Sequence, residues 1–169
     1  MLVRGGAAMS LRDWLLAFRA QHELARAGKL SPDGWAAYRA ARDELARAML
    51  AAQRAALRPG ESPRRQLRVA RAVQAELEWS VDKLRAVTLD LSSGGMAVLL
   101  AKPPPREEEI RVQIRVPGGD PIRARARLAG VQQQPASVRV ALAFTEISDA
   151  DRDRVELLVF DTVLQQLSL

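Results

Sequence analysis

The chain has 169 residues, of which 48% are hydrophobic, 27% charged and 4% aromatic, a mixture typical of one folded domain. With no cysteine and one histidine, His22, the sequence excludes disulfides, cysteine-ligated metal centres and histidine pairs for metal binding or proton relay. The net charge is +6, and because only three of the 26 basic residues are lysines, the remaining 23 are arginines.

No segment of the sequence is typical of membrane insertion or export. No stretch approaches the ~20 consecutive apolar residues that a spanning helix needs. Residues 1–10 also lack the apolar core of a cleaved signal peptide. We therefore expect a cytoplasmic protein that does not insert into a membrane.

The first predicted helix begins after Ser10, which together with Asp13 is typical of a capping box. Its apolar residues recur at helical spacing: Leu11, Trp14, Leu15, Phe18 and Ala25. Gly28 then indicates the C-terminal end of this helix. His22 lies in this helix, and we expect it to be partly exposed on the surface.

A second helix is predicted from Ser31, as N-cap, with Pro32 at the first helical position, to a point before Pro59. One apolar stripe runs along it: Trp35, Tyr38, Ala41, Leu45, Met49, Ala52 and Ala56. The short connection makes the two helices an antiparallel hairpin. Because two helices alone bury little surface, the hairpin should pack on the rest of the chain or on another copy, which leaves a homodimer open.

The composition changes near Gly60. Residues 1–60 carry ten basic and five acidic side chains, whereas residues 61–169 carry 16 and 15. Alanine, leucine and arginine dominate the first part, and valine, isoleucine, proline and glycine the second. Three segments are therefore predicted: a helical hairpin over residues 1–58, a linker over 59–63 and a second unit over 64–169.

The second unit is predicted to contain six strands and a closing helix. Alternating or short apolar runs indicate the strands: Val69–Trp79, Ala86–Leu91, Met96–Leu100, Ile110–Val116, Ile122–Val131 and Val138–Phe144. Arg123, Arg125 and Arg127 share one face of the fifth strand, which we interpret as the solvent face. A final helix begins at Ser148. The predicted fold class is α+β: a six-stranded antiparallel β-barrel with a C-terminal helix, preceded by the helical hairpin.

The sequence offers little for catalysis. His22 is the only histidine, and no glycine-rich loop has the form of a P-loop or a dinucleotide-binding turn. The acidic residues at 107–109 and 149–153 lack the spacing of a calcium loop. We therefore predict that the protein is not an enzyme and binds neither a metal nor a cofactor.

Two loop segments carry residues suited to a ligand. Arg64, Arg65 and Arg68 follow the linker, and guanidinium groups suit phosphate oxygens and the Hoogsteen edge of a purine. Between two predicted strands, Asp90 and Ser92 offer a carboxylate and a hydroxyl on a tight turn. A carboxylate accepts hydrogen bonds from guanine N1 and N2, and arginine donates to N7 and O6. The combination therefore favours an anionic guanine nucleotide.

Together these segments resemble the PilZ domain family, the bacterial receptors for cyclic di-GMP. That family pairs an Arg-x-x-x-Arg loop with an Asp/Asn-x-Ser-x-x-Gly turn on a six-stranded antiparallel barrel. Arg64 and Arg68 match the first motif, and Asp90, Ser92 and Gly95 match the second. The resemblance covers roughly residues 61–169 and leaves the helical hairpin outside the family pattern.

The resemblance implies a cyclic di-GMP site. The ligand-binding residues it implies are Arg64, Arg65, Arg68, Asp90, Ser92 and Gly95. The two motif arginines would hold guanines and phosphates, and Arg65 would add a phosphate contact that the motif does not require. Asp90 and Ser92 would hydrogen-bond a guanine and the backbone, and Gly95 would shape the turn.

The arginine loop lies at the junction of the two units, so ligand binding is expected to rearrange the N-terminal helices or a partner interface. The downstream protein partner cannot be named from the sequence. Two alternatives stay open: a degenerate PilZ fold that acts as a protein-interaction adaptor, and a basic nucleic-acid-binding protein. Nucleic acid is disfavoured because the second unit is nearly neutral and has only three aromatic residues.

Overall fold

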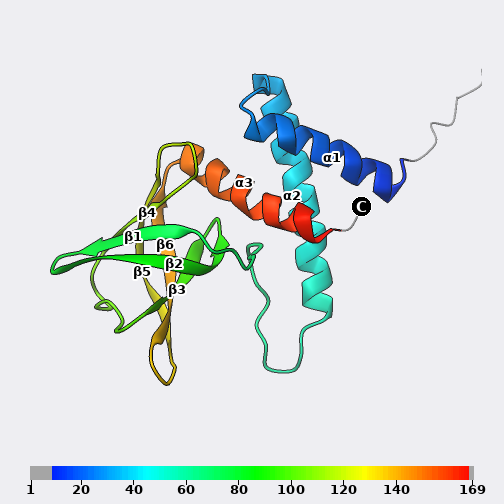
Figure 1. The fold of residues 1–169 in the computed structure, drawn as a ribbon. Helices are drawn as coiled ribbons and strands as arrows, with labels where there is room; N and C mark the ends of the chain where they lie inside the picture. The colour runs from blue at the N-terminus through cyan, green and yellow to red at the C-terminus, as the bar shows by residue number, and fades with distance from the viewer. Residues whose placement is uncertain (1–8, 168–169) are drawn as a thin grey trace, which may run out of the picture.

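The computed structural model describes residues 9–167 (Figure 1). The chain forms the helices α1 (Leu11–Arg26), α2 (Pro32–Ala55) and α3 (Asp149–Gln166) and the strands β1 (Gln74–Trp79), β2 (Asp82–Ser92), β3 (Gly95–Leu100), β4 (Ile110–Ile114), β5 (Ile122–Gln133) and β6 (Val138–Ile147). The expectation about a signal peptide in residues 1–10 lies largely outside the described residues. Within the described range, no helix combines the length and apolar character that crossing a membrane requires.

The six strands close into a barrel in the order β1-β2-β3-β6-β5-β4, and every neighbouring pair is antiparallel. Alternate side chains fill the interior, as the buried Ile110, Val112 and Ile114 of β4 show. On β5 the predicted arginine face is exposed, while the residues between the arginines are buried. The predicted fold class, an antiparallel barrel with a closing helix and an N-terminal hairpin, is confirmed.

The first strand differs from its predicted range, Val69–Trp79, because β1 begins only at Gln74. Val69 instead forms an isolated bridge to Leu91, with backbone hydrogen bonds of 3.0 and 2.9 Å. The hydroxyl of Thr88 then donates to the carbonyl of Arg71 at 2.6 Å and accepts from the amide of Val73 at 2.9 Å. With the backbone bond from the amide of Thr88 to the carbonyl of Val73 at 2.9 Å, these side-chain bonds take the place of a regular ladder, so residues 69–73 run beside the end of β2 without extending β1.

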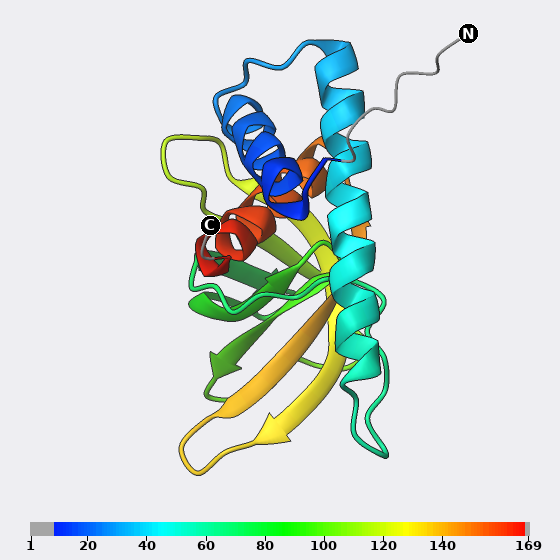
Figure 2. The ribbon, with the colours of Figure 1, turned by 90° about the vertical axis from the view of Figure 1, so that its right-hand side faces the viewer.

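The predicted helix starts are confirmed. The hydroxyl of Ser10 accepts a hydrogen bond from the amide of Asp13 at 3.1 Å, and that of Ser31 accepts from the amide of Gly34 at 3.1 Å. Gly28 follows α1 with a φ of +66°, a conformation that favours glycine. The predicted apolar stripe of α2 is wrong at its end, because Ala52 and Ala56 are exposed where α2 extends beyond α1 and α3 (Figure 2).

The helical hairpin packs on α3, and α3 packs on the barrel (Figure 2). The ring of Phe18 lies 5.7 Å from that of Tyr38 and 5.8 Å from that of Phe160, so one aromatic cluster joins all three helices. Burying each such side chain stabilises the fold by about 1.5–3 kcal/mol. Packing on the same chain was one of the two predicted arrangements, and a homodimer through the hairpin stays a prediction.

The expectation that His22 is partly exposed is wrong, because its exposed fraction is 1%. Its Nδ1 lies 2.7 Å from the hydroxyl of Tyr38, and its Nε2 lies 2.6 Å from Oδ1 of Asp161 on α3. Helical periodicity places His22 beside the apolar stripe of α1 but does not show that α3 crosses the helix there. The contact with α3 buries the imidazole.

Candidate ligand-binding site

The two segments singled out from the sequence lie side by side, but the second is a loop only at its tip, because Asp90 and Ser92 belong to the end of β2 and Gly95 begins β3. The bridge between Val69 and Leu91 joins the arginine loop directly to the end of β2. The side chain of Gln66 lies over the turn between β2 and β3, since a Cβ added to Gly94 would fall 1.7 Å from its Oε1. Residues more than 20 positions apart in the sequence therefore form one surface.

Asp90 is the centre of this surface, and its exposed fraction is 8%. Nε of Arg68 lies 3.5 Å from Oδ1 of Asp90, and Nη2 of Arg139 contacts Oδ2. Among residues 9–167 no group forms a hydrogen bond with the buried Oδ1, because the contact with Arg68 is an ion pair without hydrogen-bond geometry. Two guanidinium groups therefore compensate the buried charge, while one carboxylate oxygen stays available as an acceptor.

Ser92 closes the turn after β2. Its hydroxyl donates to the carbonyl of Gly95 at 3.3 Å and accepts from the amide of Gly94 at 3.3 Å. Gly95 does not have a positive φ, so backbone conformation is not the reason for glycine here. A Cβ at Gly95 would fall 2.1 Å from the carbonyl oxygen of Leu142, so glycine is required because β3 approaches β6 closely at this point.

Arg64 and Arg65 are exposed, and the structure does not bring them into contact with Asp90. Within residues 9–167 neither forms an ion pair or a side-chain hydrogen bond. Arg64 lines a hollow of about 500 Å³ between the linker and the last turns of α2, where Gln53 and Arg54 lie opposite. Of the predicted arginines, only Arg68 contacts Asp90 in this structure.

Arg139 is a residue of this surface that the sequence reasoning missed. It lies on β6 between the buried residues Val138 and Val140, so its side chain points to the outside of the barrel. Ala141 pairs with Ala97, which pairs with Asp90, and these short side chains leave room for the Arg139 guanidinium to reach the carboxylate. The only signal in the sequence is a lone arginine in an apolar strand, which does not indicate its partner.

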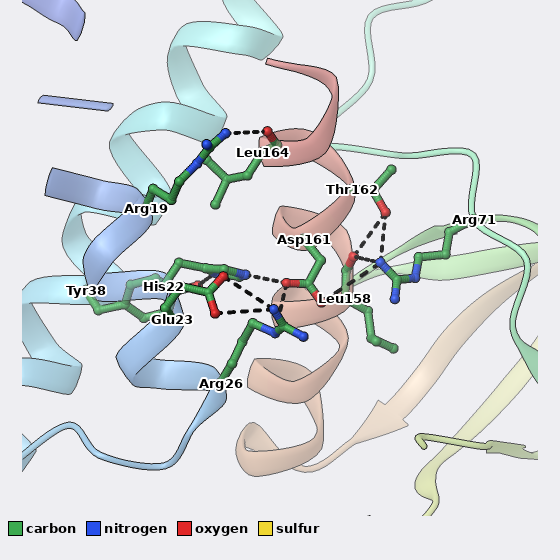
Figure 3. A network of polar contacts seen from close by, with 10 residues as sticks. All are labelled: Arg19, His22, Glu23, Arg26, Tyr38, Arg71, Leu158, Asp161, Thr162 and Leu164. Atoms are coloured by element: carbon green, nitrogen blue, oxygen red, sulfur yellow. Dashed lines mark hydrogen bonds and ion pairs between the residues drawn. The ribbon is translucent and has the colours of Figure 1, made fainter. Parts of the chain in front are cut away.

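A second polar cluster joins the arginine loop to the helices, with Asp161 at its centre (Figure 3). The carboxylate of Asp161 contacts His22, lies 3.2 Å from Nε of Arg26 and lies 3.9 Å from Nη1 of Arg71. The same Nη1 donates to the carbonyl of Leu158 at 3.2 Å and to the hydroxyl of Thr162 at 3.1 Å. Arg71 follows Arg68 by three positions, so the segment that carries the loop is fixed to α3.

On the other side of this cluster, Tyr38 connects α2 to His22. Since a carboxylate can only accept, Nε2 of His22 is the donor to Asp161, while Nδ1 pairs with the phenol hydroxyl on the other side of the ring. Burial raises the pKa of Tyr38 above its ordinary value, which keeps the phenol protonated as a donor. One chain of polar contacts therefore runs from the arginine loop through α3 to both helices of the hairpin.

Chemically, the surface around Asp90 presents a carboxylate acceptor beside two guanidinium groups. It suits a ligand that carries both negative charge and a pair of N–H donors. Among residues 9–167 there is no group of three or more histidine or acidic side chains that could hold a metal ion.

The comparison with protein families gives one match, to the PilZ domain over residues 62–161. No curated protein matches the sequence. Among solved structures, the Bacillus subtilis inhibitor of motility MotI/DgrA is similar, with a TM-score of 0.57 and 20% identity, over 64% of this chain and 55% of that protein. Its match therefore spans about half of its length.

Two further similar structures contain a nucleotide. The PilZ domain of YcgR from Escherichia coli with c-di-GMP matches with a TM-score of 0.51 and 17% identity, over 62% of this chain and 94% of that domain. The K. pneumonia MrkH complex with c-di-GMP matches with a TM-score of 0.53 and 14% identity, over 62% of this chain and 53% of that protein. At these identities the likeness concerns the fold.

Proposed function

Because this chain belongs to the PilZ domain family, we propose that it is a non-catalytic receptor for cyclic di-GMP. The observation that carries the proposal is the state of Asp90, a buried carboxylate with two guanidinium groups beside it and one oxygen without a hydrogen-bond donor. A buried acceptor of this kind fits the N1–H and N2–H donors of a guanine. The c-di-GMP in the similar YcgR and MrkH structures supports this choice of ligand.

The predicted arginines supply the charge that this ligand needs. Each phosphodiester of cyclic di-GMP carries one negative charge, and guanidinium groups bind phosphate oxygens through paired hydrogen bonds. Arg68 already lies at Asp90, while the exposed Arg64 and Arg65 are free to fold onto the ligand. Ser92 and Gly95 keep the turn compact beneath it, through the hydroxyl contacts and the close approach described above.

The proposal includes a route from the ligand to the helices. Residues 64–169 bind the nucleotide, residues 59–63 connect this unit to the hairpin, and the hairpin over residues 1–58 changes its packing when the nucleotide binds. Movement of Arg64 changes the hollow that it shares with the end of α2, and movement of the loop acts on Arg71 and through it on α3. A change in how the hairpin packs would alter the surface offered to a downstream protein partner.

Isothermal titration calorimetry with cyclic di-GMP tests this function. We expect the full chain to bind, and Arg68→Ala to weaken binding by about tenfold or more, because a hydrogen bond to a charged group contributes about 1.5–3 kcal/mol. Arg127→Ala is the matched control, because this arginine is exposed on the outer face of β5. Absence of binding by the folded wild-type chain, or equal affinity of the wild type and Arg68→Ala, would contradict the proposal and favour a protein-interaction adaptor.

A further inference from the structure

We infer that Arg139 is a positioning residue of the nucleotide site, which orients Asp90 to recognise the donor edge of guanine. This inference rests on the proposed function and extends it to a residue outside both sequence motifs. The contact that carries it is between Nη2 of Arg139 and Oδ2 of Asp90.

The two oxygens of Asp90 have different surroundings. Arg139 donates to Oδ2, whereas Oδ1 is buried and has no hydrogen-bond donor within the described part of the chain. Nε of Arg68 lies 3.5 Å from Oδ1. Since Arg139 holds Oδ2, it also holds the orientation of Oδ1, the oxygen that has no hydrogen bond and that a ligand would reach once the exposed end of Arg68 moves aside.

The backbone explains why these two residues meet. The pairing of β2 with β3 shifts register between Thr88 and Asp90, and such an irregularity re-aims a side chain. Asp90 is in register with Ala97, and Ala97 with Ala141, so Arg139 lies only two positions along β6 from the row that contains Asp90. The alanines place no bulky side chain between the guanidinium and the carboxylate.

The burial of the pair indicates a role beyond surface charge. The Asp90 side chain is 11% exposed, while those of Arg139 and Arg68 are 34% and 35% exposed. The carboxylate is thus enclosed and both cations reach solvent, where a ligand would approach. Ion pairs between exposed side chains contribute little, and this pair differs from them because its carboxylate is buried.

The consequence is selectivity for guanine. A carboxylate has about four lone-pair positions, so Oδ2 can keep its bond from Arg139 while the group accepts from N1–H and N2–H of guanine. A base without the N2 amino group makes one bond fewer to a correctly oriented Asp90.

Calorimetry with two ligands tests this inference: cyclic di-GMP and cyclic di-IMP, whose hypoxanthine bases keep N1–H but lack the N2 amino group. We expect the wild type to prefer cyclic di-GMP. Arg139→Ala should weaken the binding of cyclic di-GMP by about tenfold, which is the effect of losing one charge-assisted hydrogen bond. The same change should weaken the binding of cyclic di-IMP less. Arg139→Lys should restore part of the preference, because the cation and a donor are retained.

The outcomes separate the inference from the function. If the wild type binds cyclic di-GMP and Arg68→Ala weakens it, but Arg139→Ala keeps the wild-type affinity and preference, only this inference is wrong. If Arg139→Ala loses the same factor of affinity for both ligands, Arg139 contributes only charge and does not orient Asp90, and this inference is also wrong. Failure of the folded wild type to bind removes both proposals. Arg139→Gln, which keeps part of the aliphatic stem but removes the guanidinium, replaces Arg139→Ala if circular dichroism shows that the alanine variant does not fold.

Discussion

Nε2 of His22 lies 2.6 Å from Oδ1 of Asp161, across the interface between the first helix of the hairpin and the closing helix of the barrel. Asp161 also lies 3.9 Å from Arg71 on the segment that continues the arginine loop (Figure 3). The helical hairpin is therefore connected to the proposed nucleotide site by charged and hydrogen-bonded groups in addition to apolar packing. This connection leads to a test of stability and a test of coupling.

His22→Ala is expected to destabilise the protein by about 2–4 kcal/mol. The change leaves the buried phenol of Tyr38 without its partner and removes one donor from the carboxylate of Asp161. The free energy of unfolding in urea measures the effect. Arg12→Ala, at an exposed position on the same helix, serves as the control. Equal stability of His22→Ala and the wild type would show that the polar cluster does not hold the helices.

Arg71→Ala is expected to weaken the response of the hairpin to cyclic di-GMP while nucleotide binding persists. The guanidinium of Arg71 contacts Leu158, Thr162 and Asp161 on α3, so its removal disconnects the loop from the helices. Hydrogen exchange of α1 and α2 with and without the nucleotide measures the response. An identical ligand-dependent change in the wild type and the variant would contradict this route.

Gly95→Ala is expected to destabilise the barrel by about 1–3 kcal/mol, the usual cost of an overpacked site. The added Cβ would fall 2.1 Å from the carbonyl oxygen of Leu142, and a backbone atom cannot move aside as a side chain can. Gly130→Ala is a matched control on a strand, because its nearest atom, Cβ of Ala141, would lie 3.9 Å away. Thermal unfolding compares the two, and equal melting temperatures would contradict the close approach of β3 and β6.

The contact of Asp153 with α2 predicts a dependence of stability on pH. Burial raises the pKa of Asp153, but hydrogen bonds from Arg39 and Arg42 outweigh this effect and hold the pKa below its ordinary value of 3.8. Since the pKa is lower in the folded state, the stabilisation is complete above the unfolded value and is lost as the pH falls through the folded one.

Asp153→Asn tests this dependence through urea unfolding at a series of pH values. The difference in unfolding free energy between the wild type and the variant should be constant from about pH 7 to about pH 5 and should shrink below the ordinary aspartate pKa. The neighbouring Arg154 donates to Asp151 and not to Asp153, so it is left unchanged. A difference that persists or grows in acid would mean that Asp153 does not act through its charge.

Much of the barrel was predictable, because alternation of apolar residues depends only on neighbours in the sequence. The arginine face of β5 and the N-caps Ser10 and Ser31 are such local features. The predicted start of β1 at Val69 is wrong, because the side chain of Thr88 takes the place of ladder bonds before Gln74. That interaction joins two segments and has no local signal.

The candidate site was predictable only in part, for the same physical reason. The arginine loop and the aspartate turn are recognisable as motifs, but the contact between Arg139 and Asp90 depends on the register of β2, β3 and β6. The burial of His22 likewise depends on where α3 crosses α1. Contacts of this kind follow from packing between distant segments and not from residue type or spacing.

The most direct test of the account is the affinity of Asp90→Ala for cyclic di-GMP, measured by calorimetry beside the wild type. Asp120→Ala, an exposed aspartate in the loop between β4 and β5, is the control. We predict that the wild type and the control bind alike, and that Asp90→Ala binds at least about tenfold more weakly because guanine loses its charged acceptor. Wild-type affinity in folded Asp90→Ala would contradict the central claim that this buried carboxylate receives the nucleotide.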